Sequence, residues 1–300
     1  MNKHKKTVLV SGATGMLGQA LCIALEAKGH SVRRLSRGTT ADVQWDVDAG
    51  TIDAGAMTGV DVVVHLAGEP VAQRWTDVTK ARILKSRIGG AQLLVNALLK
   101  EPTPPDYITA SGINFYGHQC GVGVTEGSPL GEGFLAHVCE QWEGAAQPLI
   151  DAGIRSVSAR IGMILSSQGG ALTKMLPAFK LGLGGVIGAG SQHMSWVSLP
   201  DAVRILLLAI EDTSIQGPLN VVSPQPLTNR VFTQSLGAAL KRPTFFPMPA
   251  LAVKALFGKM GTEVLCSDVG VLPQVLLDRG FEWDFTDIKS CFDACMAKQF

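Results

Sequence analysis

Residues 7–18 read TVLVSGATGMLG. The apolar run at its start is typical of a strand, and a glycine-rich turn leads from it into a segment with apolar residues at helical spacing. The glycines form the pattern G-x-x-G-x-x-G at Gly12, Gly15 and Gly18. Between a strand and a helix, such glycines permit a tight turn, leave room for a pyrophosphate and let the helix approach the strand. The stretch therefore predicts a dinucleotide-binding loop.

The first helix is expected to hold the diphosphate through its backbone. The first turn of an α-helix has N–H groups without intrahelical partners and a partial positive charge, both of which favour an anion. A glycine-rich turn that binds nothing is the alternative interpretation. The expected cofactor contacts in this loop are Gly12, Thr14, Gly15, Met16, Leu17 and Gly18.

The end of the second expected strand, Ser31–Ser36, indicates which dinucleotide binds. A site specific for NAD usually offers an acidic residue there to the ribose 2′-hydroxyl. This chain has Ser36 followed by Arg37, whose guanidinium can hold a 2′-phosphate with two hydrogen bonds. Arg33 and Arg34 fit a solvated edge better. The sequence thus predicts NADP(H) as cofactor.

A third short strand is expected at Val43–Asp46. Its last residue, Asp46, either accepts a hydrogen bond from the adenine amino group or caps a turn, and the sequence favours neither.

Apolar strands and amphipathic helices alternate to about residue 168, with further strands expected at 61–66, 106–111 and 155–160. This alternation is typical of βαβ units in a parallel sheet. Glycine- and proline-rich turns then separate shorter helices. We expect an α/β fold: a Rossmann-type doubly wound parallel sheet over residues 1–168 that binds NADP(H), and a smaller C-terminal substrate-binding domain over 169–300. A strand near 219–222 is expected to return to the main sheet, so that the two domains interleave.

Composition excludes several classes of protein. With 46% hydrophobic and 17% charged residues the chain is not disordered, and a net charge of +1 gives no global field for nucleic acid or an anionic membrane. The six scattered cysteines suit reduced thiols in a cytoplasmic protein, and Cys291 and Cys295 lack a third ligand for a metal. We expect a small-molecule substrate, no metal, no nucleic acid and no membrane partner; a homodimer stays open.

Further motifs run nearly from end to end of the chain. They are LAGEP at 66–70, RW at 74–75, SR at 86–87, YG at 116–117, WE at 142–143, RIG at 160–162, GLGG at 182–185, GAG at 188–190, SWV at 195–197, NVVSP at 220–224, VLP at 271–273 and GF at 280–281. Together with the glycine-rich loop, this string resembles the atypical extended short-chain dehydrogenase/reductases called the epimerase family, the branch labelled cell-division-inhibitor-like nucleoside-diphosphate-sugar epimerases. The resemblance implies a Rossmann fold and a nicotinamide cofactor.

The same resemblance assigns further cofactor contacts. It implies that Ser36 and Arg37 hold the 2′-phosphate. It also implies a contact from Arg87, which its position alone would make a surface ion-pair partner. The remaining contacts expected from the motifs are Leu66, Ala67, Gly68, Arg160 and Ile164.

The usual catalytic pair of this superfamily is missing. Ordinary members use Tyr-x-x-x-Lys on the helix after the fifth strand, where i, i+4 spacing puts both side chains on one face. Alignment on Glu143 places Leu135 at the tyrosine position and Cys139 at the lysine position. The usual serine or threonine position falls on Gly112. These departures argue against the ordinary alcohol–ketone mechanism.

Substitute acid/base groups are therefore sought elsewhere, and the candidates are Tyr116, Glu69 and Ser111. Tyr116 could instead be a loop-packing aromatic residue, and Glu69 a turn carboxylate. Cys139 could be a reactive thiol, although buried inert cysteines are commoner.

A substrate pocket is expected around Arg74, Trp75, Lys174, Gln192 and Trp196. The tryptophans could equally be ordinary core residues between the two domains.

Two functions follow from these patterns. The first is an NADP(H)-dependent oxidoreductase or epimerase-like enzyme with non-standard acid/base residues. The second is an NADP(H)-binding sensor or regulatory protein without catalysis. An ordinary nucleotide-sugar epimerase or dehydratase is disfavoured because the tyrosine–lysine pair is absent.

Overall fold

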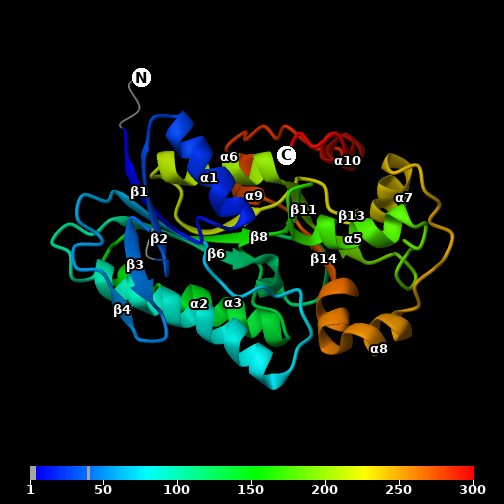
Figure 1. The fold of residues 1–300 in the computed structure, drawn as a ribbon, viewed down its shortest axis with the longest axis horizontal. Coiled ribbons are helices and arrows are strands. Elements are labelled where there is room, and N and C mark those ends of the chain that lie inside the picture. The colour runs from blue at the N-terminus through cyan, green and yellow to red at the C-terminus, as the bar shows by residue number, and fades with distance from the viewer. Residues whose placement is uncertain (1–4, 39–40) are drawn as a thin grey trace.

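The computed structural model describes residues 5–38 and 41–300, and its centre is an eight-stranded sheet in the order β12-β8-β6-β5-β1-β2-β3-β4 (Figure 1). Neighbouring strands are parallel except β3 and β4, which are antiparallel. The predicted α/β class and Rossmann-type sheet are confirmed. The strands are β1 (Thr7–Ser11), β2 (Ser31–Ser36), β3 (Val43–Asp46), β4 (Thr51–Ile52), β5 (Val62–His65), β6 (Asp106–Gly112), β8 (Ser156–Ile161) and β12 (Gly217–Val221).

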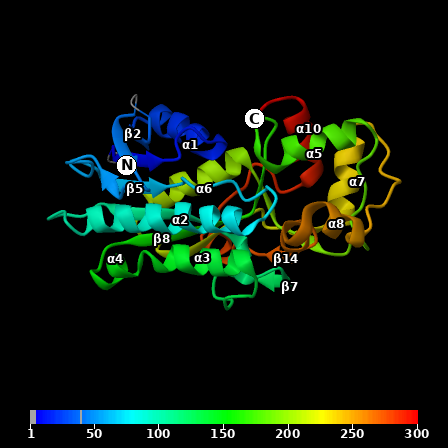
Figure 2. The same ribbon diagram turned by 60° about the horizontal axis from the view of Figure 1, so that its bottom comes forward.

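Helices cover both faces of this sheet (Figure 2). The reason is visible in β5, where Val62 and Val64 pack into one apolar cluster and Val63 into another. The first cluster includes α1 and α6, and the second includes α2. These helices and those beside them are α1 (Met16–Ala27), α6 (Leu199–Glu211), α2 (Asp77–Leu98), α3 (Phe134–Gly144) and α4 (Gln147–Asp151).

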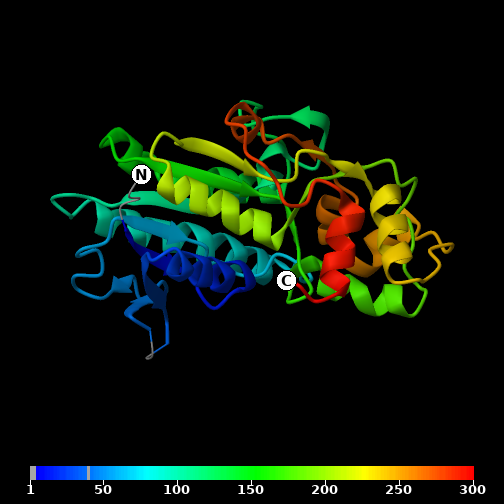
Figure 3. The same cartoon turned by 90° about the horizontal axis from the view of Figure 1, so that it is seen from above.

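The smaller C-terminal region lies beyond the carboxyl ends of the parallel strands (Figure 3). Its β12 pairs with β8 and forms the edge of the main sheet, so the region is threaded into the Rossmann half. Three two-stranded sheets, β10–β13, β9–β11 and β7–β14, join its other parts. The remaining elements are η1 (Ile113–Tyr116), β7 (Gln119–Val124), β9 (Met163–Leu165), α5 (Gly170–Lys180), β10 (His193–Met194), β11 (Trp196–Ser198), β13 (Leu227–Thr228), α7 (Asn229–Ala239), α8 (Ala250–Met260), η2 (Gly261–Leu265), β14 (Asp268–Val271), α9 (Gln274–Asp278) and α10 (Ile288–Met296).

A fully buried carboxylate, Asp201, ties α6 to the C-terminal segment. Its two oxygens accept hydrogen bonds from the backbone N–H groups of Asp284, at 2.7 Å, and Phe285, at 3.0 Å. Ser198, which caps α6, donates to the same carboxylate at 2.7 Å, and Arg204 donates at 3.1 Å. A buried charge is tolerated because each oxygen has donors.

The variant Asp201→Ala is expected to lower the free energy of unfolding by about 3 kcal/mol, because buried donors lose their charged acceptor. Urea denaturation measures the change. The matched control is Asp284→Ala, which removes the exposed partner of the same arginine and should cost about 1 kcal/mol or less. Equal losses of unfolding free energy in the two variants would contradict the role of Asp201 in joining α6 to the C-terminal segment.

Candidate functional site

The glycine-rich loop turns tightly between β1 and α1. Gly12 has φ +70°, and a Cβ there would lie 2.8 Å from the Ala67 nitrogen. A Cβ on Gly18 would collide with the Gly12 carbonyl oxygen. The sequence-based reasons for these two glycines, the turn and the close helix, therefore hold in the structure.

The N-terminus of α1 is left open. Gly15 is its N-cap in extended conformation, with no side-chain cap, and its own N–H donates to the Gly12 carbonyl at 3.0 Å. Thr14 and Gly15 are exposed, and Met16 and Leu17 are half-buried. The N–H groups of the first turn are consequently available to an anion.

Ser11, the last residue of β1, bonds to the residues that follow the neighbouring strand β5. Its hydroxyl oxygen accepts from the N–H groups of Leu66 and Ala67, at 3.2 and 3.3 Å. The hydroxyl proton is then directed to Nδ1 of His65, 2.7 Å away. This arrangement makes His65 an acceptor at Nδ1, so its proton sits on Nε2, which has no hydrogen-bond partner in the described part of the chain.

His65 was not among the residues predicted for the site, although it directly precedes the LAG motif. Its ring lies edge-on to Trp45 and Trp142, at centroid distances of 5.8 and 5.9 Å. Burial lowers the pKa of His65 to about 3. A neutral imidazole is thus buried directly before the LAG segment.

The end of β2 carries the residues expected at the 2′-phosphate. Arg33 donates to backbone carbonyls at 3.1 Å, and Arg34 pairs with Glu26 at 2.6 Å. Arg37 is exposed, and the described residues give it no hydrogen bond or ion pair. The Ser36 hydroxyl accepts from the Gly38 N–H at 3.2 Å. Arg37 is therefore the guanidinium of this group that is available to a ligand.

Asp46 caps a turn. Its Oδ1 accepts from the N–H groups of Asp48 and Ala49, at 2.8 and 3.0 Å. Of the two roles that the sequence left open, the structure shows the cap.

Arg87 reaches from α2 beneath the LAG segment. Its guanidinium donates to the Glu69 carbonyl at 2.9 Å, packs against Gly68 and lies 5.0 Å from the Trp142 ring centroid. Burial lowers its pKa. The surface ion-pair interpretation of Arg87 is therefore wrong, because the side chain is largely enclosed and bonded to backbone.

Ile164 lies on β9, close to the glycine-rich loop. The loop residue Met16 contacts Gly169 and Gly170 at the start of α5, and Gly170 approaches the Ile164 carbonyl. The structure thus brings Ile164 toward the loop, although the two are far apart in sequence.

Arg160, on β8, is buried, and its guanidinium bonds to interior partners. It forms two hydrogen bonds with Glu143, at 2.9 and 2.8 Å, and lies 3.5 Å from the Phe115 ring centroid. It also donates to the Tyr116 hydroxyl at 2.9 Å. Only 4% of the Arg160 surface is exposed, so its positive charge interacts with internal partners and not with solvent.

Two of the candidate acid/base residues belong to the same network. The Tyr116 hydroxyl donates to the Asn220 side chain at 2.7 Å, and Ser111 donates to Glu143 at 2.6 Å. Both are buried, and burial raises the pKa of Tyr116. For Tyr116 the packing role that the sequence left open is the one the structure displays.

Glu69 is the candidate with an accessible carboxylate. Its side chain is 32% exposed, accepts from Gln73 at 3.1 Å and lies 3.8 Å from Arg82. It stands directly after the LAG segment, at the carboxyl end of β5.

The positions of the missing catalytic pair are apolar in the structure as well. Leu135 and Cys139 are both buried side chains of α3, and the Cys139 thiol donates to the Gly112 carbonyl, at the end of β6, at 3.6 Å. Burial raises the pKa of Cys139 to about 11. Such a thiol is inert rather than nucleophilic at neutral pH.

The expected pocket residues are only partly brought together. Lys174 donates to the Ala72 carbonyl at 2.9 Å and so links α5 to the segment that contains Arg74 and Trp75. Gln192 bonds within its own loop. Trp196 is 1% exposed in the core, which is the alternative that the sequence left open.

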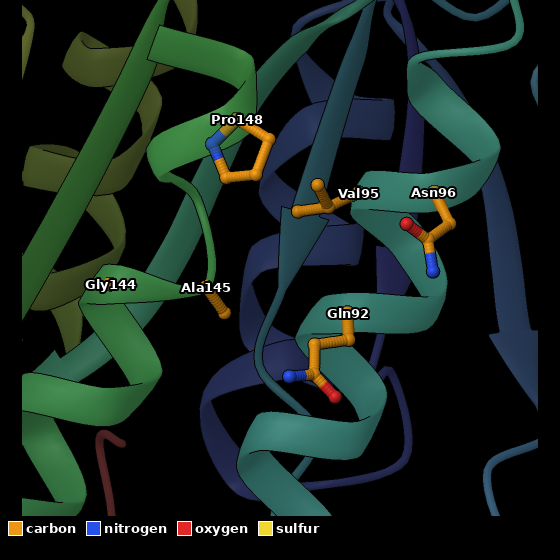
Figure 4. Close-up of a pocket in the computed structure, with 6 residues that line it drawn as sticks. All are labelled: Gln92, Val95, Asn96, Gly144, Ala145 and Pro148. Atoms are coloured by element: carbon orange, nitrogen blue, oxygen red, sulfur yellow. The ribbon is translucent and has the colours of Figure 1, made fainter. Parts of the chain in front are cut away.

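A separate shallow pocket lies between α2 and α3–α4 (Figure 4), lined by Gln92, Val95, Asn96, Gly144, Ala145 and Pro148. These residues belong to the C-terminal half of α2, the end of α3 and the start of α4, remote from the carboxyl ends of the strands. Within residues 5–38 and 41–300, no cluster of three or more His, Cys, Asp or Glu side chains could hold a metal ion. Within the same residues, no helix is long and apolar enough to cross a membrane.

The pH dependence of stability tests whether the His65 imidazole has a lowered pKa in the folded protein. A folded-state pKa near 3, below the unfolded value of about 6.5, means that the unfolded state binds the proton first. Stability is then fully present above pH 6.5 and falls by about 1.4 kcal/mol per pH unit as the solution is acidified toward pH 3.

Urea denaturation between pH 7 and pH 5 measures this slope. His65→Gln should flatten it, whereas His137→Gln, at an exposed position on α3, should leave it unchanged. A slope that survives in His65→Gln would show that other groups cause it.

The chain is similar to known proteins in sequence and matches a protein family. Residues 8–221 match the family described as NAD dependent epimerase/dehydratase family, and residues 248–295 match a domain of unknown function, DUF1731. Epimerase family protein ML0860 of Mycobacterium leprae is 40% identical over 289 residues, which are 95% of this chain and 94% of the relative.

Two solved structures are also similar. The crystal structure of human epimerase family protein SDR39U1 (isoform2) with NADPH has a TM-score of 0.88 and 34% identity, and the match covers 97% of this chain and 99% of that one. The nucleoside-diphosphate sugar epimerase from Corynebacterium glutamicum has a TM-score of 0.80 and 30% identity, over 97% of this chain and 58% of that one.

Proposed function

Because this chain belongs to the NAD dependent epimerase/dehydratase family, we propose that it binds NADP(H) in the crevice between the carboxyl ends of β1 and β5. The observation that carries the proposal is the uncapped start of α1, at which backbone N–H groups are open beside a loop with no side chain at Gly12, Gly15 and Gly18. The human relative crystallised with NADPH supports it.

The residues present fit this dinucleotide. The first turn of α1 would hold the diphosphate, and the segment Leu66–Gly68 would line the crevice. Arg37, with Ser36, would hold the 2′-phosphate that distinguishes NADP(H) from NAD(H). The structure offers Arg37 for this purpose because Arg33 and Arg34 are already engaged.

We infer that the protein uses this site for binding rather than for the ordinary alcohol–ketone reaction. Bound NADPH would supply a hydride, but the protein must also supply a proton to the substrate oxygen. Leu135 and Cys139 cannot do so, and the Tyr116 and Ser111 hydroxyls are held in a buried network. A sensor or regulatory role accords with this geometry.

The second candidate function is an oxidoreductase or epimerase-like enzyme that uses Glu69. The observation in its favour is an accessible carboxylate at the carboxyl end of β5, where ligands of such sheets bind. In that case Glu69 would exchange a proton with the substrate, and Arg87, bonded to its backbone carbonyl, would fix its position.

Arg37→Ala is expected to weaken NADPH binding by roughly 10- to 100-fold, because a charge-assisted contact to the 2′-phosphate is lost. Binding of NADH should change by less than about threefold, since it lacks this phosphate. Isothermal titration calorimetry measures both. Arg34→Ala, which removes a guanidinium already paired with Glu26, is the control and should leave NADPH affinity near the wild-type value. Equal losses for both dinucleotides would refute the role of Arg37.

Absorbance of NADPH in the presence of a panel of carbonyl compounds separates the two functions. For the sensor we expect tight binding and no oxidation of NADPH by any substrate. Turnover that is abolished in Glu69→Gln and retained in Tyr116→Phe would establish the enzyme instead.

A further inference from the structure

The charge of this protein is unevenly distributed along the chain. From Thr213 to Thr262 there is no aspartate or glutamate, and the same holds from Ala152 to Pro200. These stretches nevertheless contain lysines and arginines, among them Lys174, Lys180, Arg230, Lys241, Arg242, Lys254 and Lys259. The net charge of +1 hides this segregation, because the acidic residues lie mainly elsewhere.

Large apolar side chains are exposed in the same part of the molecule. Phe245 is 84% exposed and Phe246 67%, in the connection between α7 and α8. Leu251, in the first turn of α8, is 78% exposed. Leu181 and Leu183, just after α5, are 75% and 60% exposed. We call these five residues the distal apolar patch.

Two segments build the patch side by side. Arg242 donates to the Lys180 carbonyl at 2.9 Å, and backbone hydrogen bonds between Val186, Gly188 and Met248 continue the contact. In Figures 1 and 3 the α7–α8 connection lies at the end of the molecule opposite to β3 and β4. The patch is therefore remote from the end of the sheet that carries Arg37.

Exposed cations accompany the patch. Lys180 precedes Leu181, Lys241 and Arg242 precede the two phenylalanines, and all three are exposed. Lys254 is three residues after Leu251 on α8 and so shares its helical face. The segments that form the patch have no acidic residue to neutralise these cations.

This composition argues against a second copy as the occupant. In a two-fold dimer the same surface meets itself, so the cations of the patch would find no acidic partner across the interface. The occupant must bring negative charge. Side chains as exposed as Phe245 and Leu251 project from the surface rather than line a groove, and a bilayer interface accepts such side chains without a complementary cavity.

We propose that the distal apolar patch docks on the surface of an anionic lipid bilayer. The phenylalanine and leucine side chains enter the boundary between headgroups and acyl chains, and the lysines and Arg242 lie against the anionic headgroups. The expectation that no membrane partner exists came from net charge, which does not report where charges lie.

Sedimentation of the full chain with lipid vesicles tests the proposal. Binding to phosphatidylcholine vesicles that contain phosphatidylglycerol should exceed binding to pure phosphatidylcholine by roughly tenfold or more at low salt, and should weaken as salt is added. The double variant Phe245→Ser/Phe246→Ser and the double variant Lys180→Glu/Lys254→Glu should each reduce this binding roughly tenfold or more.

Matched controls are Ile23→Ser, which removes a 60% exposed apolar side chain on α1, and Lys289→Glu, an exposed lysine on α10. Both should bind vesicles as the unaltered chain does. Circular dichroism and thermal unfolding show whether each variant is folded, independently of cofactor binding.

Three results of the vesicle experiment would overturn the proposal. They are no binding to either vesicle, equal binding to both, and patch variants that bind as well as the controls. A dimer in light scattering that dissociates in Phe245→Ser/Phe246→Ser would also overturn it, because a second copy would then cover the patch.

Discussion

The close approach of two backbones, at Gly12 and at Leu66–Ala67, is the constraint on which the rest of this structure depends. A Cβ at Gly12 would lie 2.8 Å from the Ala67 nitrogen, so only glycine fits there. The Ser11 hydroxyl closes the same junction by accepting two N–H groups and donating to His65. The junction fixes the ends of β1 and β5 relative to each other, next to the uncapped start of α1.

A buried polar network joins the end of β6 and helix α3 to β8. Arg160 on β8 holds Glu143 on α3, and these two bind Tyr116 and Ser111. The network continues through Asn220, whose backbone N–H donates to Glu126 at 3.0 Å and whose side chain donates to the Leu272 carbonyl at 2.9 Å. A charge enclosed in this way is stable only while every partner is present. The network therefore connects the sheet to the C-terminal region. The hydroxyls of Ser111 and Tyr116 donate their hydrogen bonds within it.

The glycine-rich loop and the distal apolar patch are connected through α5. Met16 of the glycine-rich loop contacts Gly169 and Gly170 at the beginning of this helix, and Lys174 bonds the segment after β5. The residues immediately after α5, Leu181 and Leu183, belong to the patch. One helix thus contacts the glycine-rich loop at its start and is followed by exposed apolar residues just beyond its end.

Local patterns in the sequence determined the fold class and the glycine-rich loop, because strand–helix alternation and glycine spacing depend on neighbouring residues. They also made Arg37 the candidate for the 2′-phosphate. The charge segregation around the patch is also visible in the sequence, but the net charge conceals it. Only the tertiary structure decided that Arg160 and Tyr116 are interior partners, that Trp196 is core and that His65 is a buried partner of Ser11. Those outcomes depend on which donors and acceptors meet when distant strands pair, and burial, which sequence spacing does not report, sets whether a side chain keeps its charge and its access to a ligand.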